Sequence, residues 1–301
     1  MTRRRALVGV ALLGLLAALA FEAGARWLLR APGATRPPIT VPVPDGARGM
    51  QVSVGPPDAT LDAWIFDPPG APRATILAIH GVWDDKQSRV GLARYLAGRG
   101  ARVVLVDLRG HGASTGAHLY FGAQEADDIV QVLDALERDG ELVAPLGVHG
   151  SSYGGAVAHQ LAGRDPRVTA VVTVAAFADM PGLMRAYADA SWPGVAWAIP
   201  DVALRLLGWR AATIGGFTLE DTDVVPAVRR STAEVLLFHG DADEVVPFEH
   251  AARIAEACRP RGCRLETLRG ANHDRALHNR DVRRAAARFL RDELGLADRR
   301  L

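Results

Sequence analysis

One pentapeptide constrains this chain more than any other stretch. Residues Gly150–Gly154 have the sequence Gly-Ser-Ser-Tyr-Gly, and they lie between an apolar run, Leu142–Val148, and a helix-compatible run, Ala156–Ala162. Gly-x-Ser-x-Gly between a strand and a helix is typical of a nucleophile elbow, a turn so tight that side chains at the two glycines would clash. The central residue, Ser152, would then be held with its hydroxyl exposed above the edge of a sheet.

From Ala74 onward, short apolar runs rich in β-branched residues alternate with helix-compatible segments. This alternation indicates a mostly parallel central sheet with helices on both faces. Apolar alternation near Ile39–Val43, Met50–Val54 and Leu61–Phe66 predicts an antiparallel pair ahead of it. We expect the later strands at Ala74–Ile79, Ala101–Val106, Leu142–Val148, Val168–Val174, Val235–Phe238 and Arg264–Leu268, and helices at Arg89–Leu96, Ala123–Leu136, Ala156–Ala162, His250–Ala257 and Val282–Leu294.

Residues 177–230 interrupt this alternation. They combine short helical stretches and four prolines with large apolar side chains, namely Met180, Met184, Trp192, Trp197 and Trp209. We interpret the segment as a helical cap that lines a substrate site. The alternative is a structural insertion whose aromatic side chains pack only into its own small core.

Ser152 needs partners, because a serine hydroxyl is a poor nucleophile at neutral pH without a base and an acid. Ser151 and Ser114 are alternative nucleophiles, but neither is centred between glycines at the turn. Of the nine histidines in the chain, we choose His273 as the base. It lies in a glycine-led loop, residues 270–274, behind the last expected strand.

The acid is expected in the loop after the strand at 235–238. A carboxylate in this role must be ionised, close to the imidazole and held by loop backbone. Asp243 is our choice, and Asp241 and Glu244 are alternatives because they are near it in sequence. The resulting chain order is nucleophile, acid, base, as in enzymes that carry their serine on a nucleophile elbow.

Acyl transfer also needs two backbone N–H groups that stabilise an oxyanion in the transition state. We expect one from Tyr153, directly after the nucleophile, and one from Val82, in the loop after the strand Ala74–Ile79. Gly81 lets the backbone turn there. Trp83 comes next, and we expect it to contact the substrate and to narrow the acyl pocket.

Five blocks carry these candidates in register. They are His80-Gly81, Asp107-Leu108-Arg109-Gly110-His111-Gly112-x-Ser114, Gly150-x-Ser152-x-Gly154-Gly155, His239-Gly240-x-x-Asp243-x-x-Val246-Pro247 and Asn272-His273. Over residues 74–275 the chain therefore resembles the α/β-hydrolase superfamily, in particular the branch with serine aminopeptidases, monoacylglycerol lipases and membrane-anchored relatives.

This resemblance implies an α/β-hydrolase fold with a helical cap insertion. It also implies a catalytic triad of Ser152, Asp243 and His273 and an oxyanion hole formed by the backbone of Val82 and Tyr153. One departure is the stretch after His80-Gly81, where relatives often have small or glycine-rich residues and this chain has Val-Trp-Asp-Asp. A large acyl group is less compatible with a tryptophan at that place.

The N-terminus differs from the rest of the chain. Three arginines, residues 3–5, precede an uncharged run, Ala6–Phe21, which as a helix would be about 24 Å long against a bilayer core of about 30 Å. A cleaved signal peptide fits the small triplet at residues 23–25. An uncleaved anchor, which we favour, fits because helix-compatible residues continue to Leu29. Either way, the arginines stay in the cytosol and the catalytic domain lies outside it, so the protein is membrane-anchored or secreted.

We therefore divide the chain into three parts. Residues 1–30 form the signal or membrane-anchor helix. Residues 31–46, rich in proline and glycine, form a linker. Residues 47–301 form the hydrolase domain, with the cap at about 177–230.

Composition excludes some function classes and leaves others open. The chain has 301 residues, 49% of them hydrophobic, and a formal net charge of +1, which gives no indication of a nucleic-acid partner. Cys258 and Cys263 do not have the spacing of a CxxC redox pair, and two cysteines alone make no zinc site. In an exported domain they could form a disulfide, and otherwise they are two free thiols. We expect no metal and no cofactor.

The residues favour a serine hydrolase that cleaves a carboxylic ester through an acyl-enzyme, with a small-molecule ester or acyl compound as substrate. A serine aminopeptidase or amidase is the alternative, because acidic residues in the cap could bind a free amino terminus; they are Asp189, Asp201, Glu220, Asp221 and Asp223. A second alternative is a binding protein that keeps the fold without catalysis.

Overall fold

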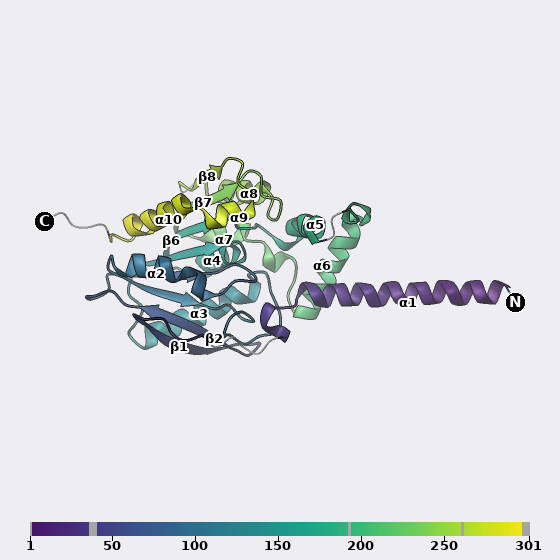
Figure 1. Ribbon diagram of the computed structural model, residues 1–301, viewed down its shortest axis with the longest axis horizontal. Helices are drawn as coiled ribbons and strands as arrows, with labels where there is room; N and C mark the ends of the chain where they lie inside the picture. The colour runs from purple at the N-terminus through teal and green to yellow at the C-terminus, as the bar shows by residue number, and fades with distance from the viewer. Residues whose placement is uncertain (1, 36–40, 192–193, 260–261, 297–301) are drawn as a thin grey trace.

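A single eight-stranded sheet forms the centre of the computed structural model, which describes residues 2–35, 41–191, 194–259 and 262–296 (Figure 1). The strand order is β1-β2-β4-β3-β5-β6-β7-β8; β2 is antiparallel to β1 and β4, and β3 to β8 are parallel. The strands are β1 Ala47–Val54, β2 Ala59–Phe66, β3 Ala74–Ile79, β4 Ala101–Val106, β5 Leu146–Ser151, β6 Val168–Val174, β7 Glu234–Gly240 and β8 Arg264–Leu268. The predicted mostly parallel sheet with an opening antiparallel pair is confirmed.

Helices cover both faces of the sheet (Figure 1). On one face lie α2 Val90–Ala97, α9 His273–His278 and α10 Arg280–Glu293. On the other face lie α3 Ala123–Arg138, α4 Tyr153–Arg164, α7 Val225–Arg230 and α8 Phe248–Cys258. Side chains of one strand therefore enter two separate cores, because successive residues of a strand point to opposite faces.

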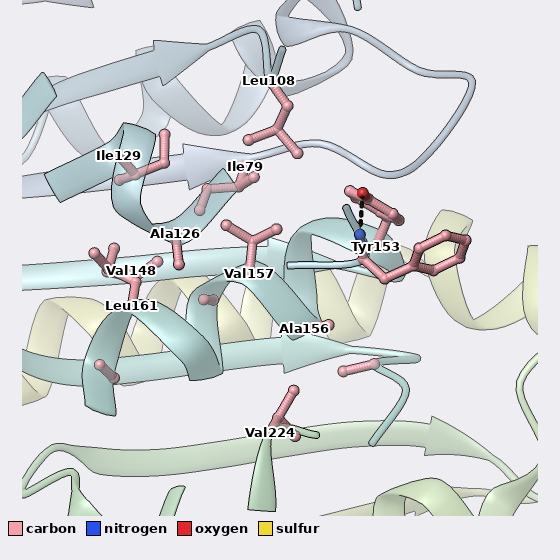
Figure 2. Packing of buried hydrophobic residues seen from close by; sticks show 14 of the residues in the cluster. Ile79, Leu108, Ala126, Ile129, Val148, Tyr153, Ala156, Val157, Leu161 and Val224 are labelled. Atoms are coloured by element: carbon pink, nitrogen blue, oxygen red, sulfur yellow. Dashed lines mark hydrogen bonds between the residues drawn. The ribbon is translucent and has the colours of Figure 1, made fainter. Parts of the chain in front are cut away.

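β3 illustrates this arrangement. Ile76 and Ala78 pack in the core under α2 and α10, whereas Leu77 and Ile79 pack in the core under α3 and α4. All four side chains are fully buried. Figure 2 shows the second core around Ile79, with aliphatic residues of α3 and α4 packed over β5. A strand buried on both faces explains why its sequence is a continuous apolar run instead of an alternating one.

Two predicted strands need correction. The strand expected at Leu142–Val148 is β5, Leu146–Ser151, which begins after Pro145, because a proline has no N–H to donate to a neighbouring strand. The strand therefore runs into the serine motif itself. The stretch expected at 39–43 is no strand over residues 41–43, and residues 39 and 40 lie outside the described part of the chain.

Between β6 and β7 the chain forms α5 Met180–Ser191, the 3₁₀ turns Ala196–Ala198 and Glu220–Thr222, α6 Asp201–Gly215 and α7. Figure 1 shows α5 and α6 standing away from the helices that cover the sheet. They pack closely on each other: a Cβ atom added at Gly208 of α6 would lie 2.6 Å from Met184 Sδ of α5. Trp192 and Pro193, which belong to the expected cap, lie outside the described residues.

The N-terminal segment is one long helix, α1 Thr2–Leu28, followed by the short 3₁₀ turn Pro32–Thr35. Leu7–Leu28 is long and apolar enough to cross a membrane, and α1 projects away from the domain (Figure 1). Its end, however, joins the domain: the Leu119 N–H donates to Leu29 O (2.7 Å) and the Ala31 N–H to Ala117 O (3.1 Å).

The two cysteines form a disulfide. Cys258, the last residue of α8, is bonded to Cys263 just before β8. Of the two states that the sequence leaves open, the structure therefore has the disulfide, which closes the short connection between this helix and the last strand.

Candidate active site

The serine motif forms the turn between β5 and α4. Ser152 has φ 49° and ψ −114°, a backbone conformation that residues other than glycine rarely adopt, and its N–H donates to Val174 O (2.8 Å). A Cβ atom at Gly150 would overlap the carbonyl of Gly154, and one at Gly154 would lie 2.8 Å from Ile79 O. Both positions therefore require glycine, because the backbones of the turn and of β3 pass too close for any side chain.

The structure brings Ser152, His273 and Asp243 together from the ends of three different strands. Ser152 Oγ lies 3.1 Å from His273 Nε2, and His273 Nδ1 lies 2.7 Å from Asp243 Oδ2. The other carboxylate oxygen of Asp243 accepts the N–H groups of Val245 (3.0 Å) and Val246 (2.7 Å). This continuous chain has the geometry in which a base accepts the serine proton while a buried carboxylate orients the imidazole.

The alternative residues have other contacts. Asp241 Oδ1 accepts the Gly270 N–H (2.6 Å) and so holds the loop that precedes His273. The Ser114 hydroxyl donates to Asp107 O (2.7 Å), directly after the end of β4, and accepts the N–H of Asp62 in β2 (2.9 Å). Each of these side chains therefore serves local backbone structure instead of the serine turn.

His273 is not in a loop as expected. It is the first residue of α9, and the side chain of Asn272 caps this helix by accepting the N–H of Arg275 (3.0 Å). Asparagine is a preferred N-cap residue, so the sequence did contain the signal for a helix start. The cap fixes the backbone beside the imidazole.

A second buried histidine lies beside Asp243. His239 Nε2 donates to Val246 O (2.8 Å) and lies 3.6 Å from Asp243 Oδ2. Burial lowers the pKa of His239, so the ring is neutral and uses its one N–H for the carbonyl. Sequence analysis assigned it no role, although it belongs to the same block as Asp243. It braces the loop that carries the acid.

The loop after β3 is held by His80. Its Nδ1–H donates to Gly81 O (2.7 Å), and its Nε2 accepts the N–H of Leu108 (3.1 Å). Burial lowers the pKa of His80 to about 4, so the neutral tautomer persists at neutral pH. In a trans peptide the N–H points opposite to the C=O. The bond to Gly81 O therefore directs the N–H of Val82 away from His80.

Two backbone amides are available beside the serine. Val82 and Tyr153 both line the pocket with Ser152, and neither N–H donates to a backbone or side-chain acceptor in the described part of the chain. Tyr153 is the first residue of α4, where helix N–H groups have no partner within the helix. A Cβ atom at Gly81 would lie 3.6 Å from Ser152 Cβ, so the loop after β3, which carries Val82, passes directly by the serine.

The side chain of Tyr153 anchors the turn. Its hydroxyl donates to Glu125 Oε1 (2.6 Å) and accepts the N–H of Phe121 (2.7 Å), the bond drawn in Figure 2. Burial raises the pKa of both Tyr153 and Glu125. The phenol therefore stays protonated and fixes α4 to the start of α3.

Lys86, the single lysine of the chain, is buried beside the same loop. It forms ion pairs with Asp107 and, at 2.8 Å, with Asp62, while its N–H donates to Asp107 Oδ1 (2.7 Å). Sequence analysis missed this network. The signal was a lone lysine in an arginine-rich chain, four residues after Val82. The network fixes the chain where the loop after β3 ends.

Ser152 lies in an apolar pocket. The pocket is lined by the end of α1, the loops after β3 and β7, the segment before α3 and helix α5; its residues are Trp27, Leu28, Arg30, Val82, Trp83, Leu119, Phe121, Ser152, Tyr153, Phe177, Met180, Leu183, Met184, Tyr187, Val245 and Val246. Arg30 is the charged residue in this set, which is drawn from the described residues. Trp83 is 64% exposed and lies at the rim.

A family model described as serine aminopeptidase, S33, matches residues 70–214. An esterase from Pyrococcus furiosus, Pf2001, superposes with a TM-score of 0.67 at 16% identity, over 86% of this chain and 99% of that chain. The chain therefore has the fold of the α/β-hydrolases, and residues 70–214 match the serine aminopeptidase family model. A puromycin-hydrolysing peptidase from Mycobacterium tuberculosis has a TM-score of 0.60 at 21% identity, over 83% of this chain and 40% of the peptidase.

Among curated proteins, the chain is similar to the uncharacterized protein YqkD of Bacillus subtilis (strain 168). The two are 26% identical over 195 residues. This alignment covers 62% of the present chain and spans about 60% of the length of the relative. The solved structures that share this fold include both esterases and a peptidase.

Proposed function

We propose that this protein is a serine hydrolase that cleaves carboxylic esters through an acyl-enzyme. The observation that carries the proposal is the hydrogen-bonded chain from Ser152 through His273 to Asp243 at the wall of an apolar pocket. Each member contacts the next within 3.1 Å. The hydrolase relatives support the reaction class.

In the first half of the reaction, His273 Nε2 takes the proton of Ser152 Oγ as the oxygen attacks the ester carbonyl. The N–H groups of Val82 and Tyr153 hold the oxyanion that forms. Asp243 keeps the imidazole oriented and stabilises its cation. His273 then gives the proton to the departing alcohol, which leaves the acyl group on Ser152.

In the second half, water repeats the sequence. His273 takes a proton from the water molecule, and the oxygen attacks the acyl carbonyl. Collapse of the second oxyanion returns the proton to Ser152 and releases the carboxylic acid. We assign the apolar side chains that line the pocket to contact with the acyl chain. We assign Trp83, at the rim of the pocket, to contact with the entering substrate.

The lining of the pocket favours an ester over a peptide with a free amino terminus. Such a terminus is a cation and needs a carboxylate partner when it leaves water. None of the described cap carboxylates lines the pocket. Asp201 is 2.6 Å from Arg185 and largely exposed, and Asp189 lines a separate hollow with Arg185 and Glu244.

Labelling with a fluorophosphonate probe tests the reaction class. The full chain should be labelled and Ser152→Ala should not, while Ser151→Ala, which alters the neighbouring serine, should still react. An unlabelled, folded wild-type chain would instead favour the non-catalytic binding protein. Turnover of 4-methylumbelliferyl butyrate beside an aminoacyl arylamide then separates ester from amide hydrolysis, and faster arylamide turnover would contradict our proposal.

We further infer that α1 stays attached as a single-pass anchor and that the domain lies outside the cytosol. Three arginines precede the apolar helix, which places its start in the cytosol. The disulfide Cys258–Cys263 supports an oxidising compartment. Alkaline phosphatase fused after residue 301 in a bacterial host should be active, and the product should keep its N-terminal tag in the membrane fraction. An inactive fusion or a tag lost by cleavage would contradict this inference.

A further inference from the structure

The end of α1 forms one wall of the pocket around Ser152. Trp27 and Leu28 line the pocket together with Met184 and Tyr187 of α5. The ring centroids of Trp27 and Tyr187 are 6.0 Å apart. An anchor helix that merely tethered the domain would need no contact with the substrate pocket. Because α1 does contact the pocket, the membrane that α1 spans lies close to the route by which substrate enters.

The same end of α1 is fastened to the cap. Glu22 forms an ion pair with Arg210 of α6, with N–O distances of 2.7 and 3.0 Å. A Cβ atom at Gly24 would lie 3.4 Å from Leu207 Cδ1, so the two helices are in close contact at their crossing. Ala25 is fully buried. The cap therefore lies beside α1 at residues 22–25.

The length of α1 determines how deep this crossing lies. The uncharged run 6–21 extends freely from the domain and spans about 24 Å, whereas a bilayer core is about 30 Å thick. The missing distance, about 6 Å, corresponds to roughly four helical residues. Those residues are 22–25, where α6 crosses α1. A bilayer spanned by α1 thus reaches the level of the cap.

The cap exposes apolar side chains at that level. Val202, Leu206 and Trp209 follow one another at helical spacing along α6 and are 63%, 52% and 59% exposed. Trp197, just before α6, is 81% exposed. The opposite side of α6 packs on α5 through Gly208. Figure 1 shows α6 on the side of the domain from which α1 projects.

We propose that this surface, which we call the cap stripe (Trp197, Val202, Leu206 and Trp209), docks on the lipid bilayer that α1 spans. Tryptophan is enriched at membrane interfaces because its ring is apolar and its N–H is polar. The proposal rests on the anchor and the hydrolase proposed above. The exposed pocket residues Trp27 and Trp83 then place the mouth of the pocket at the lipid interface. Esters dissolved in the membrane reach Ser152 in preference to esters dissolved in water.

Fluorescence quenching tests docking without any need for catalysis. The full chain is reconstituted in vesicles of phosphatidylcholine and phosphatidylglycerol, with and without brominated phosphatidylcholine, and compared with Trp197→Phe/Trp209→Phe. We expect bromine to quench the wild type more than the double variant, because two lipid-facing tryptophans are removed. Equal quenching in a chain that floats with the vesicles would overturn docking. A chain that does not float would overturn both the anchor and the docking.

Activity tests the consequence for substrate access. The variant Val202→Ser/Leu206→Gln/Trp209→Gln removes the three apolar side chains that α6 contributes to the cap stripe, but it alters no residue that lines the pocket. We expect the rate on 4-methylumbelliferyl octanoate in vesicles to fall about tenfold or more, because three apolar side chains that the bilayer would bury are lost. The rate on 4-methylumbelliferyl butyrate in solution should stay within about twofold, because the pocket is unchanged.

Tyr95→Gln is the matched control, because it changes an exposed aromatic residue on α2. This helix covers the face of the sheet opposite the core that contains Ala25 of α1. It should leave both rates unchanged. An equal loss on both esters in the stripe variant, or no loss on the octanoate, would overturn the proposal. A wild-type chain that hydrolyses neither ester would count against the esterase proposal, and quenching would still decide docking.

Discussion

At the residue scale, two aspartates of one loop differ in what their carboxylates contact. Asp243 accepts from His273 Nδ1, whereas Asp241 accepts from the backbone of Gly270. We expect Asp243→Asn to lower kcat about 10⁴-fold, because an amide favours the wrong imidazole tautomer. Initial rates on 4-methylumbelliferyl butyrate measure this. Asp241→Asn is the matched control and should keep kcat within about tenfold, since it weakens a loop contact; equal losses would remove Asp243 from the triad.

The lone lysine offers a second test at this scale. Lys86→Met would leave the buried carboxylate of Asp107 without its cation, which costs about 3–5 kcal/mol in the free energy of unfolding. Urea unfolding in mild detergent measures this loss. Lys86→Met/Asp107→Asn should recover part of the stability, because the buried charge is removed as well. If the double variant were as unstable as the single one, the ion pair would not be the cause.

At the scale of elements, the turn between β5 and α4 depends on backbone contact with β3. A Cβ atom at Gly154 would lie 2.8 Å from Ile79 O. We expect Gly154→Ala to destabilise the fold by about 1–3 kcal/mol and to reduce kcat, because the turn must move away from the strand. Thermal unfolding and initial rates measure the two effects. In contrast, Gly91→Ala in α2 has no atom within 4 Å of the new Cβ and should be neutral or slightly stabilising.

At the scale of the whole molecule, buried histidines make stability depend on pH, and four of them have strongly lowered pKa values. Burial lowers the pKa of His80 and His159 to about 4 and of His111 and His149 to about 3, below the ordinary value of 6.5. Below pH 6.5 the unfolded chain therefore binds protons that the folded chain does not. The free energy of unfolding should fall from pH 6.5 to pH 4, by up to about 1.4 kcal/mol per pH unit for each histidine.

His159→Gln checks this origin of the pH dependence. The His159 ring lies 3.2 Å from Thr173 Oγ1, a contact that an amide can also make. The variant should show a shallower decrease of unfolding free energy between pH 6.5 and pH 4, measured by urea unfolding at several pH values. An unchanged slope would assign the pH dependence to other groups.

Local chemistry explains why much of this protein could be predicted from residues alone. Runs such as Ala74–Ile79 and Val168–Val174 are strands with the predicted bounds, because continuous burial on both faces imposes a continuous apolar run. The glycines around Ser152 likewise have a purely local reason in the turn. The sequence by itself thus determined most of the strands, the helix alternation, the serine turn and the order of the candidate residues.

The tertiary structure alone decided which residues meet across the chain. Ser152 and His273 are separated by 121 positions, and only the folded chain shows that Asp243 contacts the imidazole while Asp241 contacts the backbone of Gly270. The bracing by His239, the burial of Lys86 and the place of Trp27 in the pocket also depend on contacts between distant segments. Such contacts arise from the packing of the sheet, α1 and the cap, and the order of residues along the chain does not encode them locally.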